Sequence, residues 1–181
     1  VPALAQTKRL PNVVILATGG TIAGAAATGT QAGYTSGAVT IDAMIQAVPG
    51  IKDLASIKGE QISNVGSQDM SFEIMLALAK RINELLPKPD VDGIVVTHGT
   101  DTMEESVFLT DLLVDSPKPV VFTGAQRSAD EADARGPRNL LNSICAAAAP
   151  VAAGLGAMIC FNDELHAARN VTKVHTSAVQ T

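Results

Sequence analysis

The sequence predicts an α/β fold in which a doubly wound, mostly parallel sheet carries helices on both faces. Short apolar runs, typical of buried strands, alternate along the chain with segments of helical periodicity. At least three of these runs end in clusters of hydroxyl and carboxyl side chains. In open parallel sheets such strand ends converge on the edge where ligands bind. The chain has 181 residues, 46% of them hydrophobic, which is enough for one domain with a core. Because aromatic residues make up only 3%, we expect that core to be aliphatic.

Five apolar runs are predicted to be strands, and four segments between them are predicted to be helices. The strands are expected over residues 13–17, 57–65, 92–96, 119–125 and 156–161, and the helices over 40–48, 71–86, 102–114 and 136–149. Ser71 is expected to cap the second helix, and Thr102 and Glu105 form a predicted capping box at the start of the third. The polar stretch from Glu164 onward predicts an extended segment or a hairpin rather than another buried strand.

The first strand leads directly into Thr18-Gly19-Gly20-Thr21, around which the rest of the chain is organised. Two successive glycines allow a sharp turn with positive φ, so the threonine hydroxyls are expected at the carboxyl end of a central strand. Taken alone, Thr21 is either a residue of a tight turn or a nucleophile. The small, polar segment 25–37 predicts a mobile flap. Its Tyr34 either anchors that flap or brings a hydroxyl to Thr21 when the flap closes.

Polar side chains also follow the second and third strands. Ser67, Gln68 and Asp69 come after the second, and Thr100 and Asp101 come after the third. A hydroxyl nucleophile needs a base, and a lysine serves when its surroundings favour the neutral amine, which makes Lys173 a candidate. Asp101 could hold that lysine or a substrate ammonium group. Each residue alone is more often a turn residue or a helix cap, but their combination at converging strand ends favours a catalytic site.

Several function classes are disfavoured by composition and motif content. The net charge of −5 and the pI of about 5.1 give no basic patch, so a nucleic-acid partner is not expected. No apolar run approaches the ~20 residues of a membrane span. The glycines of the first turn match neither phosphate-binding motif, which argues against a nucleotide site. His98 lacks an accompanying Gly-x-Ser-x-Gly elbow and is expected to be a buried structural residue.

The two cysteines and the amino terminus bear on the compartment. Cys145 and Cys160 lie in apolar surroundings and are expected to be buried free thiols, although a disulfide stays open; they form no zinc-binding pattern. Residues 3–5 carry an Ala-x-Ala pattern like the end of a signal peptide, so residues 1–9 are expected to be a signal-peptide remnant or a disordered tail.

Taken together, the motifs resemble those of a known enzyme family. The segments 18–24 (TGGTIAG) and 98–105 (HGTDTMEE) are similar to the two signatures of the bacterial L-asparaginases, including the glutaminase-asparaginases. Shorter matches follow in the same order at residues 59–61, 66–70, 162–163 and 171–173. The resemblance extends from residue 10 to nearly the end of the chain, and the export-like amino terminus favours the periplasmic or secreted type II branch.

The resemblance implies a fold, an assembly and a reaction. Residues 10–181 would be the larger, Rossmann-like amino-terminal domain, truncated before the smaller carboxyl-terminal domain of the family. That second domain completes the site of a neighbouring subunit, and such dimers pair into tetramers. The implied reaction is hydrolysis of L-asparagine to L-aspartate and ammonia, with L-glutamine as a second substrate. The implied reaction needs no metal or organic cofactor, no nucleic acid and no membrane.

The resemblance also implies residue roles. Thr21 would attack the substrate amide to form a β-aspartyl ester, and Tyr34 would close over it. Thr100, Asp101 and Lys173 would form a second catalytic group, with Thr100 positioning or activating water. The substrate itself would be held by Gly20, Ser67, Gln68, Thr100 and Asp101. The alternative is a non-catalytic fragment or a binding module for aspartate or asparagine.

Overall fold

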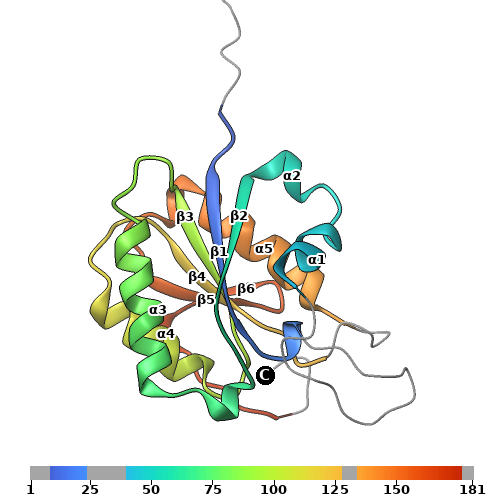
Figure 1. Ribbon diagram of the computed structural model, residues 1–181, viewed down its shortest axis with the longest axis vertical. Helices are drawn as coiled ribbons and strands as arrows, with labels where there is room; N and C mark the ends of the chain where they lie inside the picture. Colours follow the sequence, from blue (N-terminus) through green and yellow to red (C-terminus); the bar gives the residue numbers. More distant parts are fainter. Residues whose placement is uncertain (1–8, 24–39, 128–133, 177–181) are drawn as a thin grey trace, which may run out of the picture.

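The computed structural model describes residues 9–23, 40–127 and 134–176, and it has the predicted α/β architecture. One six-stranded sheet in the order β2-β1-β3-β4-β5-β6 lies between two layers of helices (Figure 1). The strands are β1 (Asn12–Gly19), β2 (Ser56–Val65), β3 (Gly93–Thr97), β4 (Val120–Thr123), β5 (Ala157–Phe161) and β6 (Glu164–Ala167).

The first five strands are parallel, and β6 runs antiparallel to β5. Asn162 and Asp163 connect these two strands and both have positive φ, 52° and 70°. Two such residues are typical of the tight hairpin turn that matches strand twist. Of the two alternatives expected from Glu164 onward, an extended segment or a hairpin, the structure has the hairpin, which places an antiparallel strand at one edge of the sheet.

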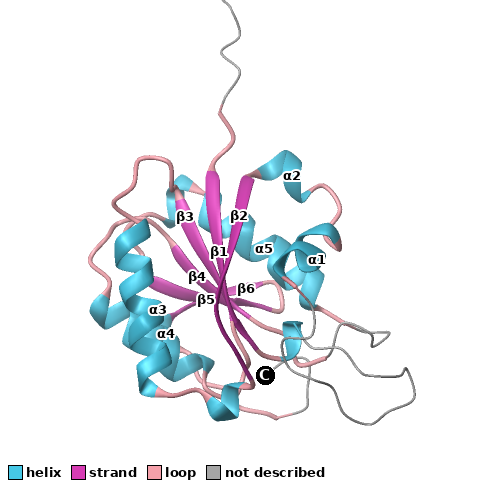
Figure 2. Cartoon of the chain, viewed as in Figure 1, coloured by secondary structure: helices cyan, strands magenta, loops and turns pink. Residues whose placement is uncertain are grey.

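The helices divide between the two faces of the sheet (Figure 2). They are α1 (Ile41–Gln46), α2 (Ile51–Leu54), α3 (Phe72–Leu85), α4 (Met103–Leu113) and α5 (Gly136–Ala148). Single 3₁₀ turns are η1 (Thr21–Ala23), η2 (Ser67–Asp69), η3 (Pro150–Ala152) and η4 (Ala168–Asn170). The helix expected over 40–48 is confirmed as α1, and the short helix α2, which was not predicted, follows it. Gly50, with a left-handed φ of 75°, directly precedes α2.

The two helix caps predicted from sequence have different outcomes. Ser71 caps α3 as expected, since its hydroxyl accepts a hydrogen bond of 3.3 Å from the Ile74 N–H. The capping box predicted for Thr102 is wrong: its hydroxyl donates instead to the Ser67 carbonyl at 2.9 Å and makes no cap bond. Thr102 is thus bonded to a carbonyl beyond the end of β2 instead of to an N–H of the first turn of α4, although α4 still begins at the predicted position.

The core consists of two layers, one on each face of the sheet. Alternate residues of β1 supply both: Val13 and Ile15 pack toward α1, α2 and α5, whereas Val14 and Leu16 pack toward α3 and α4. Strands buried on both faces need continuous apolar sequence, which explains the uninterrupted runs. The core is aliphatic as predicted, with Phe122 and Phe161 as its buried aromatic residues among those described.

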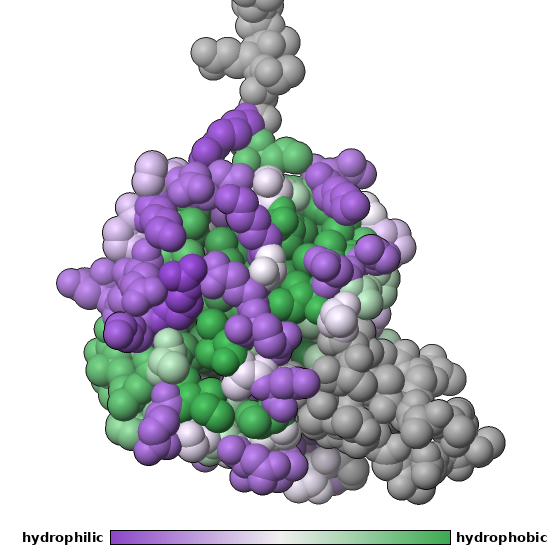
Figure 3. All heavy atoms as spheres, in the orientation of Figure 1, coloured by the Kyte–Doolittle hydropathy of each residue, from purple (hydrophilic) through white to green (hydrophobic). Residues whose placement is uncertain are grey.

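The surface mixes hydrophilic and hydrophobic side chains (Figure 3). Hydrophobic side chains gather over α3 and α4, where Phe72 and Leu112 are more than half exposed. Both cysteines are free; Cys160 is buried as predicted, but Cys145 lies on an outer position of α5 and is exposed, contrary to expectation. None of the helices in the described ranges has the length and apolar character needed to cross a membrane.

Candidate active site

The candidate site lies where the strand order reverses. β1 pairs with β2 on one side and with β3 on the other, and the later strands continue outward from β3. In doubly wound sheets the crevice at such a reversal is the usual ligand site, at the carboxyl ends of the strands. The polar clusters predicted from sequence follow β1, β2 and β3, so they meet at this crevice.

Glycines bring the three strand ends into main-chain contact. Gly19 and Gly20 have φ of 111° and 81°, values that side chains disfavour. A Cβ atom added at Gly20 would lie 2.5 Å from the Gly99 Cα, closer than any real contact. The Gly20 N–H also donates to the Val65 carbonyl at the end of β2, at 3.0 Å. The turn after β1 is therefore packed directly against the ends of its two neighbours.

Ser67 links the end of β2 to the start of α4 through two hydrogen bonds. Its buried hydroxyl accepts a 3.1 Å hydrogen bond from the Asp101 N–H, and its carbonyl accepts the Thr102 hydroxyl. A Cβ atom on Gly99 would lie 2.6 Å from the Ser67 Cβ, so the contact again requires glycine. Gln68 is exposed, and its amide donates to Asp69 at 3.1 Å.

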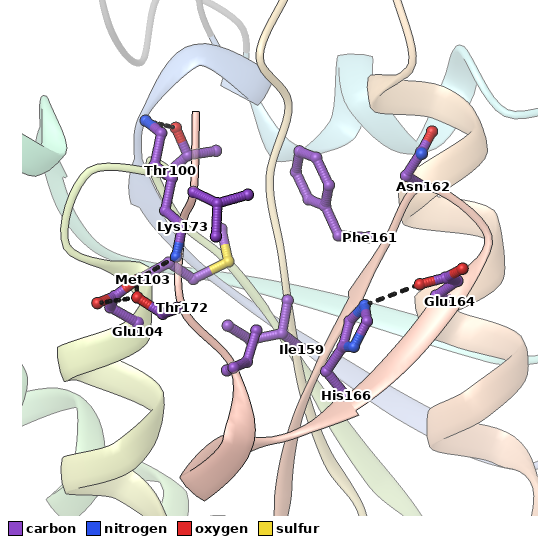
Figure 4. A pocket seen from close by; sticks show the side chains of 12 residues that line it. Thr100, Met103, Glu104, Ile159, Phe161, Asn162, Glu164, His166, Thr172 and Lys173 are labelled. Carbon is purple, nitrogen blue, oxygen red and sulfur yellow. Dashed lines mark hydrogen bonds and ion pairs between the residues drawn. The ribbon is translucent and has the colours of Figure 1, made fainter. Parts of the chain in front are cut away.

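Lys173 joins Thr100 and Asp101, two of the predicted catalytic residues, into one hydrogen-bonded group. Its Nζ donates to the Thr100 Oγ1 at 2.8 Å and to the Asp101 Oδ1 at 2.7 Å (Figure 4 draws the Thr100 side of this pair). The Lys173 side chain is 16% exposed and that of Asp101 is 56% exposed. Partial removal of water on the lysine side strengthens the attraction between the charges. The arrangement places the Lys173 amino group next to a hydroxyl oxygen and a carboxylate.

The two threonines of the predicted site occupy equivalent places. Thr21 begins η1 and is largely buried, one residue after Gly20. Thr100 follows Gly99 in the same way, and these two glycines are the ones in close contact. Both threonines therefore lie at the crevice between β1 and β3. Tyr34 lies outside the described residues.

Two residues near the site have purely structural contacts. Thr18, whose hydroxyl was expected at this strand end, donates instead to the Thr97 carbonyl at 3.0 Å inside the sheet. His98 is fully buried, as predicted, and its Nδ1 is 2.7 Å from the Gly99 carbonyl, so Nδ1 carries the proton. Burial lowers the pKa of His98 from its ordinary value, although the bond to Gly99 acts in the opposite direction.

Two residues at the site were missed by sequence reasoning. Gln126 accepts the Thr100 hydroxyl at 3.1 Å and donates to the His175 carbonyl at 3.3 Å. Glu104 accepts hydrogen bonds from the Thr172 hydroxyl and the Lys173 N–H. Glu104 belongs to the motif at residues 98–105, but the sequence predicted only that it lies in a helix and assigned it no contact. No sequence signal identifies Gln126, because its partners are distant along the chain.

Lys173 and Glu104 lie in the wall between two hollows. One, of about 400 Å³, has Ile159 and Phe161 at its centre and the β5–β6 hairpin on its far side (Figure 4). The other, of about 430 Å³, is more open and lies beside Asp101. Neither is lined by Thr21.

Comparison with known proteins gives consistent matches. The model of the family described as "Asparaginase, N-terminal" matches residues 12–181. L-asparaginase 2 of Bacillus subtilis is 50% identical over 97% of this chain and 47% of its own length. The probable periplasmic L-asparaginase of Haemophilus influenzae is 49% identical, over 98% of this chain and 50% of its own length.

A solved structure agrees with these sequence relatives. The crystal structure of a probable cytoplasmic L-asparaginase from Campylobacter jejuni superimposes with a TM-score of 0.90 at 44% identity. The match covers 94% of this chain and 52% of that one. The chain thus spans about half the length of the relatives it matches. The family match over residues 12–181, together with these relatives, shows that the chain belongs to the asparaginase family and corresponds to its amino-terminal domain.

Proposed function

We propose that this chain carries the catalytic residues of an amidohydrolase that converts L-asparagine to L-aspartate and ammonia. One observation carries the proposal: Lys173, Thr100 and Asp101 form a hydrogen-bonded group at the strand-order reversal, where the turn containing Thr21 also lies. A hydroxyl beside a lysine and a carboxylate is an arrangement suited to proton transfer in acyl transfer. The names of the relatives, L-asparaginase and glutaminase-asparaginase, support the same substrate class.

In the first step, the Thr21 hydroxyl oxygen attacks the side-chain amide carbon of asparagine. The hydroxyl proton passes to a base and then to the leaving nitrogen, so ammonia departs and a β-aspartyl ester remains on Thr21. Main-chain N–H groups near Thr100 stabilise the negative oxygen that develops. The Asp101 N–H takes no part, because it already donates to Ser67. Tyr34 closes over the substrate in this scheme.

In the second step, water attacks the ester carbonyl carbon, and Thr21 regains its proton as aspartate is released. Thr100 positions that water, and Lys173 exchanges a proton with Thr100 across the 2.8 Å contact. The Thr100 hydroxyl donates to Gln126 in the resting site, so its lone pairs face Lys173. Neither step uses a metal ion or an organic cofactor.

Substrate binding in this scheme uses groups at the same crevice. The half-exposed Asp101 carboxylate holds the α-ammonium group, and Ser67 and Gln68 hold the α-carboxylate. Gly20 contributes close approach of the backbone rather than a hydrogen bond from its N–H, which Val65 already accepts. L-glutamine, one methylene longer, is the second proposed substrate; the name of one 46%-identical relative, glutaminase-asparaginase, supports it.

The alternative is a module that binds aspartate or asparagine without turnover. Ammonia release from L-asparagine, measured on this chain and on a chain of the relatives' full length, separates the two. The proposal predicts release by the longer chain at least, and loss of release in its Thr21→Ala variant. Calorimetric binding of aspartate with no ammonia release from either chain would favour the binding module. A fully active Thr21→Ala variant would exclude Thr21 as the nucleophile.

Compartment and assembly belong to the same proposal. Export to the periplasm or the exterior is supported by the Ala-x-Ala pattern at residues 3–5, although the relatives include a protein named periplasmic and one named cytoplasmic. A homotetramer built as a dimer of dimers is proposed from the family resemblance alone. Cell fractionation tests the first point, and light scattering of the full-length protein tests the second.

A further inference from the structure

The segment that carries Lys173 has little support from secondary structure. Residues 171–176 follow η4 and form neither helix nor strand. Val171 packs against the core layer under α3 and α4. Beyond that contact, side chains of other elements hold the segment: Glu104 from α4, and Gln126 through the His175 carbonyl. The position of Lys173 therefore depends on these side chains more than on main-chain pairing.

Glu104 makes the larger share of these contacts. It lies in the first turn of α4, and its carboxylate accepts the Thr172 hydroxyl at 2.9 and 3.0 Å from its two oxygens. The same carboxylate accepts the Lys173 N–H. Figure 4 shows Glu104 directed toward Thr172 and Lys173, away from Thr100. Glu104 thus binds the main chain of Lys173 and the side chain of the preceding residue, not the ammonium group.

These contacts fix the end of a long, flexible side chain. A lysine loses much rotamer freedom when its Nζ is held in one place, and the loss is smaller when its backbone is already fixed. The Lys173 Nζ must meet both Thr100 and Asp101, at 2.8 and 2.7 Å. Both acceptors lie immediately before α4, the helix that carries Glu104. One helix start therefore supplies the acceptors and the anchor.

We infer that Glu104 is a positioning residue that holds the main chain at Lys173 so that its ammonium group meets Thr100 and Asp101. This inference rests on the proposed function, since it assigns Glu104 a part in that reaction. The competing explanation is that Glu104 only stabilises α4, because an acidic side chain in the first turn interacts favourably with the helix dipole. Glu105 shares that turn, is exposed and has no side-chain partner among the described residues. It is therefore a matched control.

The kinetic test compares Glu104→Ala, Glu104→Gln and Glu105→Ala in the full-length protein, with ammonia release as the assay. We expect Glu104→Ala to lower kcat by about 100-fold, as misplacement of a catalytic group by ~1 Å does, with little change in KM. Glu104→Gln keeps one acceptor oxygen and should recover part of that loss. Glu105→Ala should match the wild type. Equal losses of kcat in Glu104→Ala and Glu105→Ala would overturn the inference in favour of a general effect on α4.

A second readout does not depend on activity. The rate at which an amine-reactive ester labels Lys173, measured by mass spectrometry, should rise by roughly fivefold in Glu104→Ala as the ammonium group moves into solvent. Thr172→Val, which removes the hydroxyl alone, should raise the rate less, and Glu105→Ala should leave it unchanged. Unchanged labelling in Glu104→Ala would overturn the inference. If the wild type released no ammonia while the labelling changed as expected, the proposed reaction would fail and the positioning role would stand.

Discussion

The two halves of the candidate site are held by different kinds of contact. The half after β1, β2 and β3 is fixed chiefly by main chain against main chain, through Gly20, Gly99 and the Val65 carbonyl, with two hydrogen bonds at Ser67 in addition. The half that carries Lys173 is fixed by side chains, chiefly Glu104 and Gln126. Main-chain contact tolerates almost no change in shape, whereas side-chain contact can be lost one hydrogen bond at a time. Substitutions in the first half should therefore affect folding, and substitutions in the second should affect the chemistry alone.

The largest expected effect comes from Gly20→Ala. The added methyl group would overlap the Gly99 backbone at a residue whose φ of 81° already disfavours a side chain. We expect the free energy of unfolding to fall by about 3 kcal/mol or more, measured by denaturant titration. Gly50→Ala is the matched control, because its φ is 75° but nothing lies within 4 Å of the new methyl group. It should cost only about 1 kcal/mol. Equal losses would mean that backbone strain, not contact, fixes the first half.

The second prediction concerns the side-chain half. Lys173→Met removes the ammonium group that reaches Thr100 and Asp101 but keeps an unbranched side chain of similar length. Under the proposed mechanism kcat should fall by about 10²- to 10⁴-fold. The free energy of unfolding should change by about 1 kcal/mol or less, because one partner of the ion pair is more than half exposed. A large loss of stability with kcat preserved would contradict the comparison, because the half that carries Lys173 would then affect folding and not the reaction.

The third prediction uses pH to act on His98, a residue of the main-chain half. Burial lowers the pKa of His98, whose ring is bonded to the Gly99 carbonyl behind the glycine contact. Below pH ~6.5 the unfolded chain therefore binds a proton at His98 that the folded chain does not. Stability should decrease as pH falls through this range, by up to about 1.4 kcal/mol per pH unit from this residue. His98→Asn should flatten that slope between pH 7 and 5.5, and an unchanged slope would assign it to other groups.

The comparison also explains which parts of the site were predictable. The glycine turn, Ser67, and the group of Thr100 and Asp101 follow strands directly, so strand periodicity and the convergence rule for parallel sheets locate them. Lys173 was a candidate as a base for a hydroxyl nucleophile, and the family resemblance at residues 171–173 grouped it with Thr100 and Asp101. Glu104 lies 69 residues before Lys173, whose N–H it accepts. Gln126 lies 49 residues before His175, to whose carbonyl it donates. Sequence patterns contain no information at that range.

Two predictions made from local sequence were wrong because a contact with a residue distant along the chain is present instead. Thr102 should have capped α4 through its own hydroxyl, but the Ser67 carbonyl accepts that hydroxyl instead. Thr18 should have faced the crevice, but the Thr97 carbonyl on the adjacent strand accepts its hydroxyl. In both cases the hydroxyl donates to a carbonyl that is distant along the chain, which local sequence does not reveal. The fold class was insensitive to these errors because it depends on apolar periodicity, which the structure follows in both core layers.

The smallest expected effect comes from Gln126, the second side chain that links the two halves. Its amide accepts the Thr100 hydroxyl and donates to the His175 carbonyl, at 3.1 and 3.3 Å. Gln126→Met keeps the length of the side chain but makes neither bond. With a loss of about 1 kcal/mol for the two bonds together, kcat should fall by roughly fivefold. Because Glu104 still holds the main chain at Lys173, the loss should be much smaller than in Glu104→Ala. If the two variants lost equal activity, the side-chain half would be one cooperative unit in which no single anchor dominates, and a double variant would then show no further loss.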